Sequence, residues 1–365
     1  MTPLSISGHL AACYAGVMPQ APVTRRNFSR NALGGGALML GACPVPSAPL
    51  AALPWPPPPA SQRQVGVAYS LWHYPSAFGH FWDNTWGIPE LGRYVSTDRA
   101  IIRQHAAWLT DAGVDFILVD CSNDLGADLR DDTGYPYQKF EEKALMAVFE
   151  EFSMLPNPPL ISIMIGNPLA PQALFNGALT LKCDEIQSVF VANPRFNRLL
   201  LYYQQKPLVV IYGPTPALYT ESLPPWTDSR FTIRFMTCFV TQQPKILGPY
   251  GNSIRGYWSW EDRGVPSFPV VDGRPEVMTV VASWRSSKPE HIAACPRRHG
   301  ITFTESWQAA RRIGPKFVLA GTFNEWKKGE QPSAEVSKDM EPSQAFGTFY
   351  LDLLAKEAEL FKKGL

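Results

Sequence analysis

The sequence lacks a large excess of charge of one sign and has no long basic run. Its 33 lysines and arginines nearly balance 32 aspartates and glutamates, which gives a formal net charge of +1 over 365 residues. Because a nucleic-acid surface needs a concentrated positive field, we expect no nucleic-acid partner. The composition, 45% hydrophobic and 18% charged, is that of a folded globular protein with a sizeable core.

Metal-binding spacing is also missing. The six cysteines and six histidines form no CxxC pair, no Cys/His cluster and no close HxH or HxxxH pair, which argues against structural zinc. The four cysteines of the body, Cys121, Cys183, Cys238 and Cys295, are too scattered to specify a disulfide. We therefore expect neither a metal nor another cofactor.

Prolines and aromatic residues are abundant. The chain has 35 prolines, 11 tryptophans, 13 tyrosines and 20 phenylalanines. Prolines indicate many short loops, and most of the aromatic rings are expected in the core. Rings left at the surface would offer flat apolar faces of the kind that stack on sugars.

Residues 1–43 resemble an export signal. Arg25 and Arg26 precede Phe28, and the following glycine-rich apolar stretch, 32–42, is too short to span a bilayer as a helix. This order is typical of a twin-arginine signal. It predicts a bacterial protein that is exported to the periplasm or its membranes.

Residues 40–43, Leu-Gly-Ala-Cys, resemble a bacterial lipobox and predict a lipid on Cys43. Small residues at 48–52 offer a rival cleavage site, which would release a soluble protein instead. The proline-rich stretch 44–62 predicts a semi-rigid linker. The remainder, 63–365, is expected to form a single domain, and its oligomeric state is left open.

The body alternates apolar, strand-like runs with segments of helical periodicity. The eight runs are 65–72, 114–120, 160–166, 207–213, 231–239, 256–260, 277–284 and 317–326, and the clearest helices are 98–113, 139–152 and 343–363. Eight strands over about 300 residues predict a single (β/α)8 TIM barrel. A doubly wound open sheet is the alternative, because 244–255 resembles a loop where the barrel requires a helix.

In such a barrel the active site lies at the carboxyl ends of the strands. The polar and aromatic residues that follow the runs are Trp72, His73, Tyr74, Asp120, Asn123, Trp260, Glu261, Asp262, Arg285, Asn324, Glu325 and Trp326. Rings, amides and paired carboxyl groups in one mouth are what glycoside hydrolysis needs.

Each carboxyl group also has a structural explanation. Asp120 is placed to cap the turn that follows it, and Glu261 is placed to pair with Arg263 or Arg255. Glu325 is the stronger candidate, because it follows an almost uninterrupted apolar run and stands between an amide and an indole. Burial there would shift its pKa toward a catalytic range.

Several motifs together resemble the glycoside hydrolase family 71 and 99-like proteins. They are "GVAYSLWHYP", "WGIPELGRYVSTD" and "LTDAGVDFILVDCSND" near the start of the body, and "FVLAGTFNEWKKGE" and "DMEPSQAFGTFYLDLL" near its end. The resemblance covers both ends of the body well and the middle loosely. It implies a TIM barrel and an endo-acting α-mannosidase-like activity.

The family 99 pattern places catalytic glutamates at the Asn-Glu-Trp motif and three residues later. Glu325 matches the first position, whereas the second is Lys328, which cannot serve as a carboxylic acid. Either another carboxyl group supplies the proton, with Glu261, Asp262, Asp120 and Glu330 as candidates and Glu261 and Asp120 ranked above Glu330, or the chemistry differs.

We therefore expect an exported, endo-acting glycoside hydrolase with Glu325 as one catalytic carboxylate and Glu261 or Asp120 as its partner. The substrate-binding residues would be Trp72, His73, Tyr74, Trp86, Asn123, Trp260, Arg285, Asn324 and Trp326. The first alternative is a carbohydrate-binding lipoprotein without activity. A metal-dependent hydrolase using Asp120, His73 and Asp262 ranks last.

Overall fold

The computed structural model describes residues 54–75, 81–122, 136–166, 177–213, 226–238, 240–242, 245–286, 293–329 and 331–365. The export signal, Cys43 and part of the linker lie outside these residues, as do Asn123 and Glu330.

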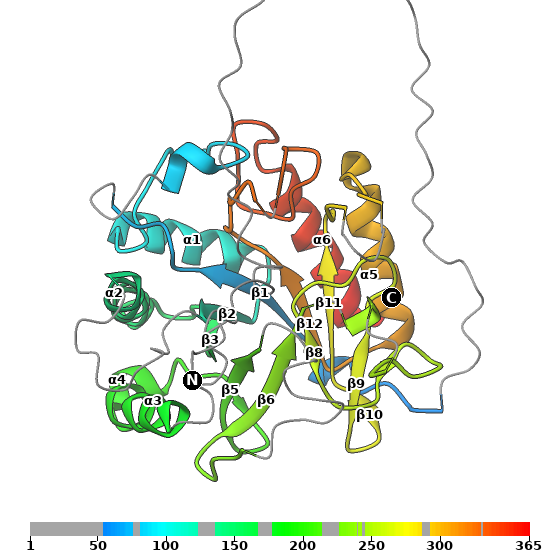
Figure 1. Ribbon diagram of the computed structural model, residues 1–365, viewed down its shortest axis with the longest axis horizontal. Helices are drawn as coiled ribbons and strands as arrows, with labels where there is room; N and C mark the ends of the chain where they lie inside the picture. Colours follow the sequence, from blue (N-terminus) through cyan, green and yellow to red (C-terminus); the bar gives the residue numbers. More distant parts are fainter. Residues whose placement is uncertain are drawn as a thin grey trace, which may run out of the picture.

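Eight parallel strands form the central sheet, one in each predicted apolar run. They are β1 (Gln64–Ser70), β2 (Phe116–Cys121), β3 (Leu160–Gly166), β5 (Lys206–Tyr212), β6 (Thr232–Thr237), β8 (Trp258–Ser259), β11 (Val277–Val281) and β12 (Phe317–Gly321). The strands pair in the order β11-β12-β1-β2-β3-β5-β6-β8, and β8 lies next to β11. The sheet thus closes almost completely, which confirms the TIM barrel and excludes the open doubly wound sheet (Figure 1).

Helices cover the outside of the barrel (Figure 1). They are α1 (Arg99–Asp111), α2 (Pro136–Phe152), α3 (Ala178–Ile186), α4 (Pro194–Asn197), α5 (Ile301–Ile313) and α6 (Phe349–Lys363). The Asp98 carboxylate caps α1 by accepting the N–H of Ala100 at 2.9 Å, and Gly113, at φ +70°, follows its last turn. The last helix begins six residues later than expected, because Gly347 adopts a left-handed conformation, at φ +54°, that α-helix does not use.

Shorter elements complete the described chain. They are the 3₁₀ segments η1 (Ala60–Gln62), η3 (Phe81–Asn84), η7 (Val240–Gln242) and η8 (Arg298–Gly300), the π-helical η5 (Gln187–Val191), and strand β4 (Tyr202–Tyr203). A second sheet of three short strands, β7 (Asn252–Ser253), β9 (Phe268–Val271) and β10 (Arg274–Pro275), lies between β6 and β11 along the chain. Of the segment 244–255, which was expected to be a loop, the described residues 245–255 are mostly turns and bends around the two-residue strand β7, and the described residues between β6 and β11 contain no α-helix.

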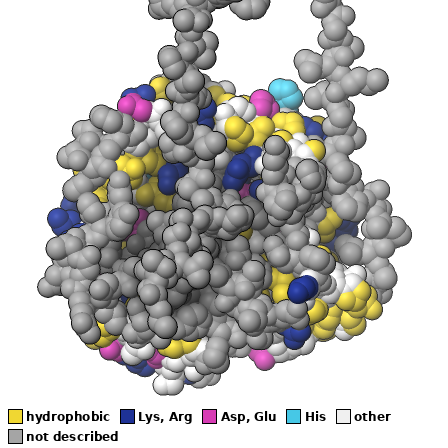
Figure 2. Space-filling view, in the orientation of Figure 1, with side chains coloured by type: hydrophobic (Ala, Val, Ile, Leu, Met, Phe, Trp, Pro, Cys, Tyr) yellow, Lys and Arg dark blue, Asp and Glu magenta, His cyan; other side chains and the backbone are white. Residues whose placement is uncertain are grey.

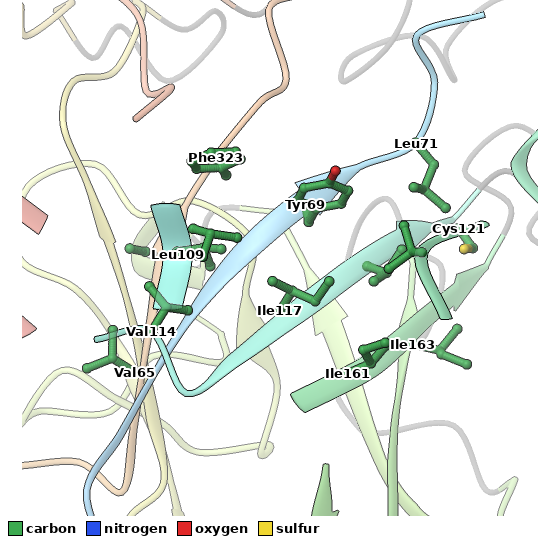
Figure 3. Packing of buried hydrophobic residues seen from close by; sticks show 14 of the residues in the cluster. Val65, Tyr69, Leu71, Leu109, Val114, Ile117, Cys121, Ile161, Ile163 and Phe323 are labelled. Carbon is green, nitrogen blue, oxygen red and sulfur yellow. The ribbon is translucent and has the colours of Figure 1, made fainter. Parts of the chain in front are cut away.

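Two apolar layers result from the alternation of side chains along the strands. Val65, Val67 and Tyr69 of β1 face outward to the helices, where they join Leu109 of α1 and Ile117 of β2 in the larger core (Figure 3). The residues between them face the barrel interior. That inner cluster includes Ala68, Phe116, Leu118, Met164, Val210, Trp258, Phe317 and Leu319.

Charged and hydrophobic side chains are interspersed among the coloured residues of the face shown in Figure 2. Within the described ranges, no helix has both the length and the apolar character needed to cross a membrane.

Candidate active site

Three carboxyl groups from different strands gather at the carboxyl end of the barrel. Asp120 is the penultimate residue of β2, Glu261 follows β8 by two residues, and Glu325 follows β12 by four. All three are buried, with at most 4% of each residue exposed. An ionised carboxylate loses much of its hydration when it is buried, so each of these groups needs a hydrogen-bond donor or a cation beside it to stay charged.

Asp120 continues the inward-facing side of β2, because it lies two residues after the interior residue Leu118. Its register partner on β1 is Ser70. Asp120 Oδ1 accepts the backbone N–H of Ser122 at 3.0 Å, while Asp120 Oδ2 and the Ser70 hydroxyl are buried and make no hydrogen bond in the described structure. Such unsatisfied polar atoms are rare in protein interiors, so they mark a place where a ligand or water would bind.

Lys338 joins the other two carboxylates. Its ammonium lies 2.7 Å from Oε2 of Glu261 and 3.1 Å from Oε2 of Glu325, and its side chain is only 4% exposed. Two oxygens that share one ammonium at these distances lie no more than about 5.8 Å apart, a bound that admits the spacing of about 5 Å found in a retaining carboxylate pair. Spacing alone therefore permits Glu261 and Glu325 to act as a catalytic pair.

The electrostatics separate the roles of these groups. Burial alone would raise the pKa of Glu261, but the Lys338 ammonium and the Arg263 guanidinium outweigh it and hold that pKa below its usual range. Burial raises the pKa of Asp120, although Ser122 and the charges of Lys327 and Lys338 oppose it. Asp120 is thus the better proton donor, and Glu261 is suited to remain ionised.

Asp339 fixes the backbone that carries Glu325. Its Oδ1 accepts the N–H of Glu325 at 2.7 Å and the Thr322 hydroxyl at 2.7 Å. Its Oδ2 accepts the N–H of Trp326 at 2.8 Å and the indole N–H of Trp86 at 2.8 Å. Four donors on one buried carboxylate make this turn after β12 rigid.

Asn324 connects the same turn to β1. Its side-chain oxygen accepts the N–H of Ser70 at 2.8 Å, and its amide nitrogen donates to the Ser70 carbonyl at 3.2 Å and lies 3.3 Å from the Tyr94 hydroxyl. The amide expected to bind sugar hydroxyls is therefore engaged with the protein. Glu341 accepts from Trp326 and Tyr94 and lies 3.0 Å from Nε2 of His105, which adds a second buried support.

Solved structures with the same architecture include glycoside hydrolases. The GH99 endo-alpha-mannosidase from Bacteroides thetaiotaomicron superposes with a TM-score of 0.53 at 15% identity, over 82% of this chain and 98% of that one. Its complex with bis-tris propane gives a TM-score of 0.54 at 16% identity, over 82% and 97% of the two chains. A glycoside hydrolase-like protein gives 0.52 at 14% identity, over 85% and 98%. This chain has a GH99-like fold.

No protein-family model matches the sequence, and no curated protein matches it. At about 15% identity, the likeness to the GH99 structures concerns the fold alone, so activity has to be argued from the residues of this chain. Lys328, at the position of the second catalytic glutamate in the family 99 pattern, is exposed. The cation that contacts both Glu261 and Glu325 is Lys338.

The aromatic residues expected at the sugar site of this GH99-like barrel differ in how deeply they are buried. Trp326 is fully buried and stacks on Trp86 with ring centroids 4.6 Å apart, so its ring packs in the interior. Trp72 and Trp260 are 4% and 8% exposed, and the Lys327 ammonium lies 4.7 Å from the Trp72 ring centroid. Tyr74 and Trp86 are half-buried and are the more accessible rings of this set.

His73 lies deep beside these rings. Its Nδ1 is 2.9 Å from the Ser96 hydroxyl, and its ring stacks on Trp82 with centroids 5.3 Å apart. Burial, with a smaller contribution from the charge of His105, lowers the pKa of His73 to about 3. The imidazole is therefore neutral at physiological pH, and Nε2 has no hydrogen-bond partner in the described structure.

Asp262 is occupied by the loop that contains it. It accepts from Ser259 Oγ at 2.7 Å, from the N–H and hydroxyl of Ser267, each at 2.6 Å, and from the N–H and hydroxyl of Thr241. Asp262 thus orders the segment that carries Glu261. Among the residues that the structure describes, no group of three or more His, Cys, Asp or Glu side chains is arranged to hold a metal ion.

Sequence reasoning missed Lys338, Asp339 and Glu341. They belong to the run 337–341, in which every residue is buried although four of the five are polar. In the sequence, a short polar run of this kind shows no hydrophobic periodicity and therefore looks the same as an exposed loop. Arg285, which was expected to bind substrate, lies half-buried after β11.

Proposed function

We propose that this chain is a glycoside hydrolase in which Glu325 acts as base or nucleophile and Asp120 as general acid. The observation that carries the assignment is the contrast within one buried site. Lys338 pairs with Glu325 and Glu261, whereas Asp120 has a pKa raised by burial and an unpartnered oxygen. Environments that push carboxyl pKa values apart are how such sites divide acid from base.

Carbohydrate hydrolysis suits the surroundings better than other hydrolytic reactions. The strand ends supply aromatic rings beside carboxyl groups, and the oxocarbenium-like transition state requires one group to protonate the leaving oxygen and another to stabilise or attack the anomeric carbon. The GH99-like fold of the chain is consistent with this reaction class. We propose a glycan substrate cut internally, which product chain lengths will test: internal cleavage yields a range of oligosaccharides, and terminal cleavage releases single sugars and leaves a shortened chain.

The experiment begins with a glycan screen for release of reducing ends by the purified protein. Glu325→Gln and Asp120→Asn should each lower kcat by about 10² to 10⁴-fold. On an aryl glycoside with an acidic leaving group, Asp120→Asn should recover most of its activity, because the departing phenolate needs no proton. Glu325→Gln should not recover.

Asp111→Asn is the matched control, since Asp111 is exposed at the end of α1. It should hydrolyse at the wild-type rate. Equal losses for Asp120→Asn on both substrates would refute the acid assignment, and wild-type protein that releases no reducing ends from any glycan would refute the hydrolase.

A carbohydrate-binding protein without activity is the second candidate. The observation in its favour is that the Lys338 ammonium lies between the two glutamates that would otherwise form the pair. Saturable glycan binding by the wild type, with no turnover and no effect of Asp120→Asn on affinity, would support it over the enzyme.

We also propose that the protein is exported and anchored by a lipid on Cys43. The support is the order of paired arginines, apolar stretch and cysteine at 25–43. Cells expressing the full chain should incorporate labelled palmitate, and Cys43→Ser should abolish the label. Label that persists in Cys43→Ser would exclude the anchor, and chain found only in the cytoplasm would exclude export.

A further inference from the structure

Lys338 contacts two of the three buried carboxyl groups of the site. Its ammonium reaches the loop after β8 through Glu261, at 2.7 Å, and the turn after β12 through Glu325, at 3.1 Å. All three side chains are at most 6% exposed, so water does little to screen these charges. Lys338 therefore connects two strand ends that no other residue named in the site connects.

The backbone around Lys338 is held in place by Gln331. The Gln331 side-chain oxygen accepts the N–H of Lys338 at 2.7 Å and the Ser337 hydroxyl at 2.8 Å, and Gln331 is fully buried. The next residue, Asp339, accepts the N–H of Glu325 at 2.7 Å. The lysine and the glutamate it contacts are thus positioned by one hydrogen-bonded frame.

Other charged side chains lie close to the three carboxyl groups of the site. Arg263 lies 3.4 Å from Oε1 of Glu261, so that carboxylate has a cation on each oxygen. The positive charges of Lys327 and Lys338 both oppose the rise that burial causes in the pKa of Asp120, at the end of β2. Arg263 faces Glu261, Asp339 accepts the backbone N–H of Glu325, and Asp120 lies within range of the Lys327 and Lys338 charges.

We propose that Lys338 is a positioning residue that holds Glu325 and Glu261 ionised and at a fixed separation, which leaves substrate protonation to Asp120. This inference rests on the proposed hydrolase. It also accounts for a buried lysine among catalytic-type glutamates: a lone ionised glutamate at this depth would take up a proton, and Lys338 prevents that. Lys338 itself need not contact the substrate.

The first test is the pH dependence of kcat/KM in Lys338→Met and Lys338→Arg. Met fills a similar volume without charge, so kcat should fall at least about 10-fold. The midpoint of the acidic limb of the kcat/KM profile should move to a higher pH by about 1 unit or more. Arg keeps the charge and should restore the wild-type limb. Unchanged limb position in Lys338→Met, or a rise in kcat, would overturn the proposal, because a rise would mean that the ammonium obstructs the substrate.

Lys182→Met is the matched control. Lys182 also lies between two glutamates, 3.1 Å from Glu142 and 2.7 Å from Glu185, but on the helices α2 and α3 outside the barrel. Its side chain is 8% exposed. Removing this ammonium should leave the pH profile of kcat/KM unchanged, so any shift seen only in Lys338→Met belongs to the site.

A second measurement does not require activity. The pKa of Glu261 is lowered in the folded protein, so its stabilisation is present above the unfolded value of about 4.3 and is lost as pH falls through the folded value. Without Lys338, burial should raise the pKa of at least one of the two glutamates. The Tm of Lys338→Met minus that of wild type should then increase as the pH is lowered from 7 to 5. A Tm difference independent of pH would refute the inference even if no glycan is hydrolysed. Absence of hydrolysis with this pH-dependent difference present would refute the hydrolase alone.

Discussion

The carboxylate of Asp339 holds the backbone of Trp326 in a left-handed conformation. Its Oδ2 accepts the Trp326 N–H at 2.8 Å, and Trp326 has φ +60° although it is neither glycine nor asparagine. Such a conformation costs free energy for a bulky residue and persists only where surrounding contacts impose it. The strained turn is the one that presents Glu325 to the barrel mouth.

Asp339→Asn should therefore destabilise the protein. An amide can replace only one of the two accepting oxygens, so two of the four donors, from Glu325, Thr322, Trp326 and Trp86, would face an NH₂ group. Buried donors left unsatisfied cost about 1–3 kcal/mol each, so the loss of two should lower the free energy of unfolding by about 2–6 kcal/mol.

Urea denaturation monitored by tryptophan fluorescence measures this loss. Asp352→Asn is the control, since Asp352 is exposed in the first turn of α6, where it accepts from the Thr348 hydroxyl, and a surface change should stay within about 0.5 kcal/mol. Equal stability of Asp339→Asn and wild type would mean that the four hydrogen bonds do not hold the turn.

His73 should make stability fall as pH decreases. The ring binds a proton in the unfolded chain near pH 6.5 but in the folded chain only near pH 3, so the stabilisation is present above 6.5 and is lost progressively below it. The contribution should approach 1.4 kcal/mol per pH unit within that window. Asp120 and Asp339, whose pKa values are raised, act in the opposite direction.

For that reason the measurement is the difference between wild type and His73→Asn, not the wild-type slope. Asparagine keeps a polar atom near the Ser96 hydroxyl and does not titrate. The stability of wild type relative to His73→Asn should decrease from pH 6.5 to pH 4.5 in urea titrations. A constant difference over this range would contradict the low pKa.

The sequence predicted the barrel well because each strand is a local signal. β3 (Leu160–Gly166) coincides with the apolar run expected there, and α1 was bounded by Asp98 and Gly113, whose capping chemistry is local too. The small sheet of β7, β9 and β10 was not predicted, because strands of two to four residues carry too few positions for a periodic pattern.

The site was predicted only in part for a related reason. Glu325 and Glu261 were identified from their places at strand ends, and the structure brings them together. Lys338 was not identified, since its role depends on contacts with residues 13 and 77 positions away and on burial of a polar loop. The burial of Trp326 likewise follows from long-range packing against Trp86, which no local pattern encodes.

Gly66→Ala should disrupt the interior of the barrel. Gly66 lies on β1 opposite Phe116 of β2, and a Cβ at this position would approach the Phe116 ring to 2.3 Å. The ring is fully buried and packs edge-on against Phe317, with centroids 5.7 Å apart, so it has no space into which to move. Overpacking of this kind costs about 1–3 kcal/mol.

Phe116→Leu in the Gly66→Ala background should recover part of this loss, because leucine vacates the space that the new methyl group needs. A double-mutant cycle in urea should then show a favourable coupling of about 0.5–3 kcal/mol between the two positions. Gly329→Ala is the control: Gly329 is exposed and a Cβ there meets nothing within 4 Å. Additive effects at 66 and 116 would show that the clash is relieved by movement of the strands rather than by the ring, and that the inner layer of the barrel is less tightly packed than its geometry indicates.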